Sequence, residues 1–117
     1  MKNFKELIIW QKGIKIVLSV YKLVKLLPSE EKYGLISQLT RSSVSIPSNI
    51  AEGSSRKSQK EYYRFIEIAQ GSAFELETQL IIVNKVFPDL SKDVGNILSI
   101  LEEEQKMLTS FSKKLIN

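Results

Sequence analysis

The sequence contains no cysteine and no histidine among its 117 residues. Without cysteine the chain can form neither a disulfide nor a thiolate metal site, which suits a cytoplasmic location. Without histidine it lacks the usual proton shuttle and the commonest transition-metal ligand. These absences exclude most familiar enzyme sites. The sequence therefore predicts a non-catalytic protein with no cofactor and no bound metal.

Long apolar runs are missing as well. An apolar stretch from Leu7 to Trp10 is too short for the core of a signal peptide and is soon followed by lysines. No run approaches the ~20 apolar residues that a membrane span requires. We therefore expect a single cytoplasmic domain, residues 1–117, with no export signal and no membrane partner.

The charge of the chain is unevenly distributed. The net charge is +4, but residues 1–64 hold twelve Lys/Arg against five acids, and residues 65–117 hold five against eight. A basic half raises the chance of a polyanionic partner such as RNA or DNA. Many helical bundles also have unevenly charged faces, so charge alone does not decide the function.

Apolar residues recur every three or four positions, which predicts helices throughout. The first helix is expected from an Asn3–Glu6 capping box to Pro28. It carries one apolar row and a second row beside it, so it is either deeply buried or faces another subunit. The first row is Leu7, Trp10, Ile14, Val17, Tyr21 and Val24, and the second is Ile9, Ile16, Val20, Leu23 and Leu27.

The second helix is expected to start after Ser29 and to end at Gly53, because glycine suits the left-handed position that terminates a helix. Pro47 lies inside this span and should kink the helix. Two shorter helices broken at Ile46 are the alternative. We favour one kinked helix.

The third helix has the clearest signals. Ser58 and Glu61 form a capping box, and a strict apolar rhythm then runs to Phe87. Ala69, Gly71 and Ala73 should make its middle thin enough for the serine-rich face of the second helix to approach closely. A fourth helix follows, with Glu102–Glu104 expected to lie mostly outward. The fold class is an all-α, antiparallel up-down-up-down four-helix bundle.

Carboxylates and serines are the remaining candidates for catalytic groups. A di-metal centre in such a bundle needs Glu-x-x-His pairs, which this chain cannot supply. Serines 42, 43, 45 and 48 lack a histidine base. Asn49 and Glu52 are better explained as structural residues that bond backbone groups near the kink, or an arginine such as Arg56.

Basic residues are the stronger candidates for a binding site. All three arginines are expected around the turn between the second and third helices, and arginine is suited to bidentate phosphate contact. The alternative is that the lysines keep the first helix soluble and the arginines pair with nearby glutamates. The candidate nucleic-acid-binding residues are Arg41, Arg56, Lys57, Arg64, Lys12, Lys15 and Lys22.

Several segments together resemble a known family. The sequence resembles the small four-helix-bundle proteins encoded in intervening sequences of bacterial 23S ribosomal RNA genes, and the match extends over nearly the whole chain. The residues that carry the resemblance are Trp10–Lys12, Tyr33–Arg41, Ser45–Gly53, Ala69–Ser72 and Glu75–Leu80, with Pro47, Asn49, Glu52, Gly53 and Gly71 as its structural motif.

The resemblance implies an architecture more firmly than an activity. Members look like antiparallel bundles that assemble into a five-membered ring, so the second apolar row of the first helix would lie at subunit contacts. The accessory proteins of diversity-generating retroelements are similar in fold, and they bind nucleic acid and a reverse transcriptase through basic surfaces.

Three functions follow as hypotheses. The leading one is a non-catalytic homo-oligomeric bundle, a homopentamer if it follows the resemblance, that binds RNA or DNA phosphates non-specifically. The second is a ring-shaped scaffold that binds another protein and has no nucleic-acid role. The third, an unrecognised hydrolase or metal enzyme, would need a bound ion or a solvent-reachable pocket beside Glu52.

Overall fold

The computed structural model describes residues 3–116, and within that range it contains four α-helices and no strand. The helices are α1 (Ile8–Val24), α2 (Leu35–Ser54), α3 (Gln59–Val86) and α4 (Ser91–Leu115). Three short 3-10 turns precede α1, α2 and α4: η1 (Phe4–Glu6), η2 (Ser29–Glu31) and η3 (Pro88–Leu90). No helix in the described range is both long and apolar enough to cross a membrane.

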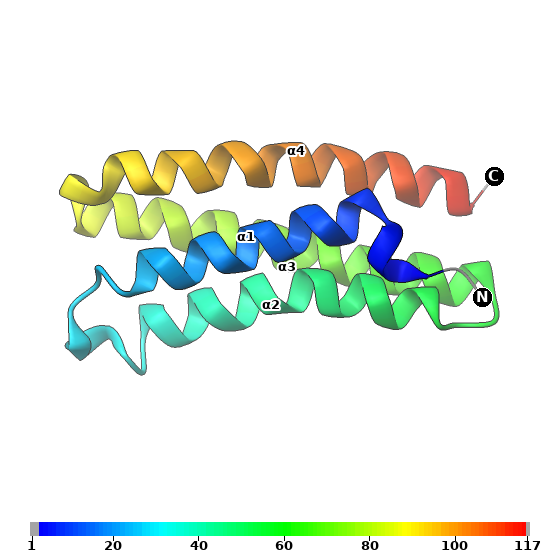
Figure 1. Cartoon of the computed structure of the whole chain (residues 1–117), viewed down its shortest axis with the longest axis horizontal. Coiled ribbons are helices and arrows are strands. Elements are labelled where there is room, and N and C mark those ends of the chain that lie inside the picture. The colour runs from blue at the N-terminus through cyan, green and yellow to red at the C-terminus, as the bar shows by residue number, and fades with distance from the viewer. Residues whose placement is uncertain (1–2, 117) are drawn as a thin grey trace.

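The four helices lie side by side and run alternately in opposite directions, as Figure 1 shows. Each helix packs against its two neighbours, α1 against α2 and α4, and α3 against α2 and α4. The predicted up-down-up-down four-helix bundle is confirmed. This topology brings η1, the α2–α3 turn and the end of α4 to the same end of the bundle (Figure 1).

Three predicted helix boundaries were wrong: both ends of the first helix and the start of the second. Asn3 caps only the η1 turn, accepting a bond from the Lys5 amide at 3.0 Å, and the extended backbone of Leu7 separates that turn from α1. The α1 helix also ends at Val24, four residues before the proline that was expected to stop it. The second helix begins at Leu35 and not after Ser29, because the non-helical backbone of Gly34 interrupts the chain after η2.

The two apolar rows of α1 differ in burial, and the second does not lie where the resemblance placed it. The second row, which was expected at subunit contacts, lies in the core, and Ile16 and Val20 in it are fully buried. The first row is the more accessible one, and Tyr21 in it is exposed. The second row therefore forms the core-facing side of α1, and the first row lies beside it at the edge of the core.

The α2 and α3 helices make the most extensive contact in the bundle. Small side chains allow it, as predicted: Ser72 donates to Ser45 Oγ at 2.8 Å, and Ser42 donates to Gln79 Oε1 at 2.7 Å. Pro47 is buried inside α2, which is one helix and not two. The single-helix interpretation of this segment is confirmed.

Two glycines serve other purposes than those predicted. Gly53 has no positive φ and does not end α2. It is buried, and a β-carbon there would lie 2.8 Å from Phe65 Cβ, so glycine is needed for the close approach of α3. Gly71 does not thin the α2–α3 contact, because it is exposed and a β-carbon there would meet nothing within 4 Å. Ala69, Ser72 and Ala73 make that contact instead.

Glu104 was expected to face outward with its neighbours, and this was wrong. Its side chain is fully buried, and neither carboxyl oxygen has a hydrogen-bond partner among the described residues. Gly13 of α1 leaves room for it, since a β-carbon there would lie 3.3 Å from both Glu104 Oε2 and Pro47 Cβ. Burial raises the pKa of Glu104 from 4.5 to about 8, partly opposed by the charge of Lys12. The carboxyl group is therefore mostly protonated at neutral pH.

Candidate nucleic-acid interface

A pocket of about 570 Å³ opens at the end of the bundle where α2 turns into α3. We call it the end pocket. It is built from Leu7 between η1 and α1, from the α2–α3 turn with the residues on either side of it, and from the last turns of α4. The residues that line it are Leu7, Ser54, Ser55, Arg56, Lys57, Gln59, Tyr62, Phe111, Lys114 and Leu115.

Local hydrogen bonds fix the turn that forms one side of the end pocket. Ser54 and Ser55 donate their hydroxyls to the carbonyls of Ala51 and Glu52, both at 2.6 Å, which satisfies acceptors at the end of α2. Ser58 accepts from the amide of Glu61 at 3.1 Å and caps α3, as the sequence predicted. Hydrogen bonds therefore fix the turn both at the end of α2 and at the start of α3.

Arg56 is held by two contacts and still presents donors to solvent. Its Nη2 donates to Glu52 Oε2 at 2.6 Å, and its guanidinium lies 4.8 Å from the centre of the Phe65 ring. The structural pairing of Glu52 with Arg56 is confirmed. An exposed pair of this kind contributes at most about 1 kcal/mol. Because guanidinium carries five N–H donors, the pair leaves others free to reach a phosphate.

Two more cations line the end pocket. Lys57 projects from the turn, Lys114 comes from the last turn of α4, and both are exposed. Together with Arg56 they place three positive charges around one opening, while no described residue in its lining is acidic. Because Glu52, just outside the lining, pairs with Arg56, the three cations leave an excess of two positive charges at the pocket. The cations come from two separate elements, so they are spread around the opening and do not follow one helix face.

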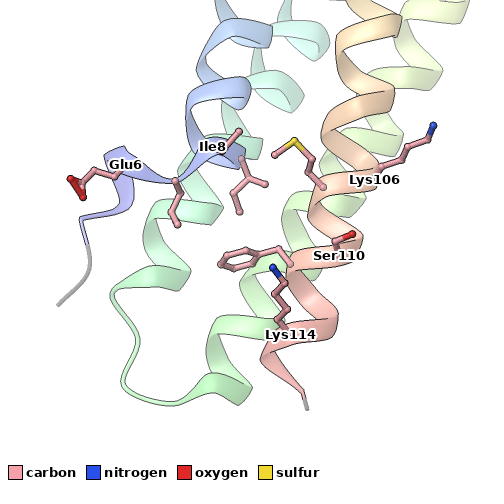
Figure 2. Close-up of a pocket in the computed structure, with 9 residues that line it drawn as sticks. Glu6, Ile8, Lys106, Ser110 and Lys114 are labelled. Atoms are coloured by element: carbon pink, nitrogen blue, oxygen red, sulfur yellow. The ribbon is translucent and has the colours of Figure 1, made fainter.

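An apolar groove of about 510 Å³ between α1 and α4 adjoins the end pocket and shares Leu7, Phe111 and Lys114 with it. Its remaining residues are Glu6, Ile8, Ile9, Lys106, Met107 and Ser110. Figure 2 shows the Lys114 side chain reaching into the groove, whereas the charged ends of Glu6 and Lys106 point away from it. We call this the side groove. It continues the apolar surface of the end pocket along the bundle.

The structure does not bring all the predicted basic residues together at one site. Arg41 lies in the middle of α2, about 20 Å along the helix from the turn that carries Arg56. It lines a separate polar groove between α2 and α3 with Glu75 and Gln79. The expectation that every arginine surrounds the α2–α3 turn was wrong, because a continuous helix through Pro47 carries Arg41 away from the turn.

The other predicted cations are spread over α1 and α3. Arg64 is exposed on α3, beyond the lining of the end pocket. Lys12 is bound to Glu103 Oε1 at 2.7 Å, and this bond lowers the pKa of the Glu103 carboxyl. Lys15 is exposed nearby, and Lys22 lines a pocket with Asp93 farther along α1. Two of the α1 lysines therefore lie beside acids of α4, a pairing that the sequence analysis did not predict.

Asn49 also has the structural role expected of it. Its amide donates to Ser45 O at 2.8 Å and to Ser45 Oγ at 2.9 Å, so it ties one turn of α2 together beside Pro47. Because Ser45 Oγ also accepts from Ser72, this bond supports the α2–α3 contact.

The sequence analysis missed Lys114 and the aromatic floor of the end pocket. Tyr62 and Phe111 pack edge to face, with ring centres 5.5 Å apart, and both stay partly accessible. Burial raises the pKa of Tyr62. One signal could have found Lys114: in an up-down-up-down bundle, the end of the fourth helix lies beside the turn between the second and third.

Comparison with known proteins places this architecture in a family. The profile of the 23S rRNA-intervening sequence proteins matches residues 5–110. The chain belongs to this family. Among solved structures it is similar to a protein of unknown function from the S23 ribosomal protein family of Bacteroides thetaiotaomicron, with 25% identity and a TM-score of 0.83. That match covers 91% of this chain and 99% of the other. A search of curated proteins gave no match.

Membership of the 23S rRNA-intervening sequence family confirms the resemblance carried by the Pro47–Gly53 motif. The structure gives this motif a physical basis. Pro47 packs beside Gly13, Asn49 donates a hydrogen bond to Ser45, and Gly53 allows α3 to approach α2 closely. The motif residues therefore set how α1 and α3 pack on α2.

Proposed function

We propose that this 23S rRNA-intervening sequence protein is a non-catalytic, homo-oligomeric bundle that binds the phosphate backbone of RNA or DNA through its end pocket. The observation that supports the proposal most directly is the set of three cations, Arg56, Lys57 and Lys114, around an opening whose described lining has no acid. Backbone phosphates are the chemical partner that such a site fits, and Lys and Arg contacts to them supply most non-specific affinity.

Affinity should be modest and should depend strongly on salt. We expect a non-specific dissociation constant no tighter than ~10⁻⁶ M at physiological salt. If three phosphates are neutralised, binding to a single strand should weaken about 20-fold, and to a duplex about 40-fold, between 50 and 200 mM salt. Fluorescence anisotropy with a labelled RNA at both concentrations measures this. No binding at 50 mM salt would end the proposal.

A charge-matched pair of variants tests the location of the site. Lys57→Gln with Lys114→Gln should weaken binding about tenfold at 50 mM salt and flatten its salt dependence. Lys85→Gln with Lys92→Gln removes the same charge from the other end of the bundle, about 40 Å along α3, and should change little. Equal losses in both pairs would mean that net charge, and not the end pocket, controls binding.

The homo-oligomeric part of the proposal is supported by an exposed apolar face on α3. Phe74 is 61% exposed, and Ile68, Ile81, Ile82 and Val86 are exposed on the same helix. A patch of this kind usually marks a contact with another protein. Light scattering of the protein with and without Phe74→Glu tests this part, since a monomer in both cases would contradict it.

The same face favours a second function, a scaffold that binds another protein. That function predicts an association that salt does not weaken and that survives removal of Lys57 and Lys114. The salt titration of the two charge variants therefore also separates the two proposals.

A further inference from the structure

The end pocket has more apolar surface than a site for phosphates requires. Beneath its three cations lie Leu7, Tyr62, Phe111 and Leu115, all of them partly accessible. A duplex keeps its bases stacked inside, so it has no exposed base that could pack against these four side chains. A strand with unpaired bases offers flat apolar faces together with its phosphates. We infer that the end pocket binds single-stranded nucleic acid and takes an unpaired base against its aromatic floor.

The size and shape of the pocket fit a base. Its volume of about 570 Å³ lies within the range of roughly 300–1,000 Å³ that small organic ligands occupy. Tyr62 and Phe111 meet edge to face at an interplanar angle of 61°, so the edge of one ring lies against the face of the other, and both side chains stay partly accessible. A ring face that is not covered by its neighbour is the surface on which bases stack in single-strand-binding proteins.

The charges lie where the backbone of such a strand would run. Arg56 and Lys57 come from the α2–α3 turn, and Lys114 comes from α4, so cations line the opening from two elements. Ser54 and Ser55 use their hydroxyl hydrogens on backbone carbonyls. Their oxygens stay available to accept hydrogen bonds from a ring N–H or an amino group of a base.

The side groove gives the strand a path beyond the first nucleotide. It shares Phe111 and Lys114 with the end pocket and continues between α1 and α4, with Ile8 and Ser110 on its two walls (Figure 2). Lys114 lines both cavities and is placed to contact a phosphate between two nucleotides. This inference rests on the proposed nucleic-acid function, and it names the form of nucleic acid.

Three ligands of equal length distinguish binding of an unpaired base from binding of the phosphate charge. Fluorescence anisotropy at 50 mM salt would compare labelled oligouridylate of 20 nucleotides, an abasic strand of the same length, and an RNA duplex. We expect oligouridylate to bind about tenfold tighter than the abasic strand, because only the base can stack. Equal binding of all three would overturn the inference and leave the proposed function standing. If none binds, both fail.

Phe111→Leu tests the aromatic floor directly. Leucine keeps the site apolar and removes the ring, so oligouridylate binding should weaken about fivefold to tenfold while duplex binding stays the same. Tyr33→Leu, at an exposed aromatic residue between η2 and α2 at the other end of the bundle, is the control and should change neither. Circular dichroism confirms that both variants fold. Equal losses for strand and duplex in Phe111→Leu would overturn the inference.

An acidic peptide is the competing occupant. Oligoglutamate of matched charge should displace oligouridylate at least about tenfold less well than unlabelled oligouridylate does, because a carboxylate chain has no base to stack. Equal displacement would show that the pocket responds to charge alone and would overturn the inference.

Discussion

Replacing Glu104 with glutamine should make the protein more stable at neutral pH. In the folded chain the carboxyl group is fully buried, and neither oxygen has a hydrogen-bond partner among the described residues. Folding therefore requires that it be protonated, whereas in the unfolded chain it ionises with its ordinary pKa. The amide of Glu104→Gln has the same shape and never ionises, so its folding needs no proton.

The size of the effect follows from the two pKa values of Glu104. A difference of one pKa unit corresponds to about 1.4 kcal/mol, and the pKa rises from 4.5 in the unfolded chain to about 8 in the folded one. Because the folded state holds the proton more tightly, the associated stability is fully present below pH 4.5 and is lost as the pH rises toward 8. The wild-type protein should lose about 3 kcal/mol by pH 7 and about 4 kcal/mol by pH 8.

Urea unfolding followed by circular dichroism at 222 nm, between pH 5 and 8.5, measures this loss at one protein concentration. Glu104→Gln should exceed the wild type by about 3 kcal/mol at pH 7, and the difference should shrink to about 1 kcal/mol at pH 5. Glu103→Gln is the control. Its neighbour Lys12 lowers the pKa of Glu103, so the stability linked to that carboxyl is present above its unfolded pKa and is lost only in acid. The reasoning is refuted if wild type and Glu104→Gln show the same slope from pH 5 to 8.

The remaining predictions concern two glycines and Asn49. Gly53→Ala should destabilise the protein by about 1–3 kcal/mol, because the new β-carbon would lie 2.8 Å from Phe65 Cβ. Gly71→Ala should stabilise it by about 0.5–1 kcal/mol, since the site is open and alanine favours a helix. Asn49→Ala should cost about 1–2 kcal/mol through the lost bonds to Ser45. Thermal unfolding of the three variants tests the set, and a Gly53→Ala protein as stable as Gly71→Ala would contradict it.

Some of the incorrect expectations could have been avoided from the spacing of residues alone. Leu101 and Leu108 are core residues of α4, and Glu104 lies three positions after the first and four before the second. That spacing places it on the inward face, but its charge argued for the surface. Gly71 likewise lies outside the rhythm of Ala69 and Ala73 and so could not face α2.

The candidate site was only partly accessible to sequence reasoning. Arg56 and Lys57 were found because they are neighbours in the turn. Lys114 was missed because it is 57 positions beyond Lys57, and only the return of α4 to the same end brings the two together. Arg41 was placed wrongly for the opposite reason, since closeness in sequence was taken for closeness in space.

The sequence by itself determined four helices, their order and most of their inward faces, because helical periodicity and capping are local properties of the chain. Contacts between distant segments had to be decided by the tertiary structure. The Lys12–Glu103 bond, the packing of Gly53 on α3 and the burial of Glu104 beside Pro47 all depend on how neighbouring helices are rotated and shifted against one another. Those rotations minimise the free energy of the whole core, so no single helix encodes them.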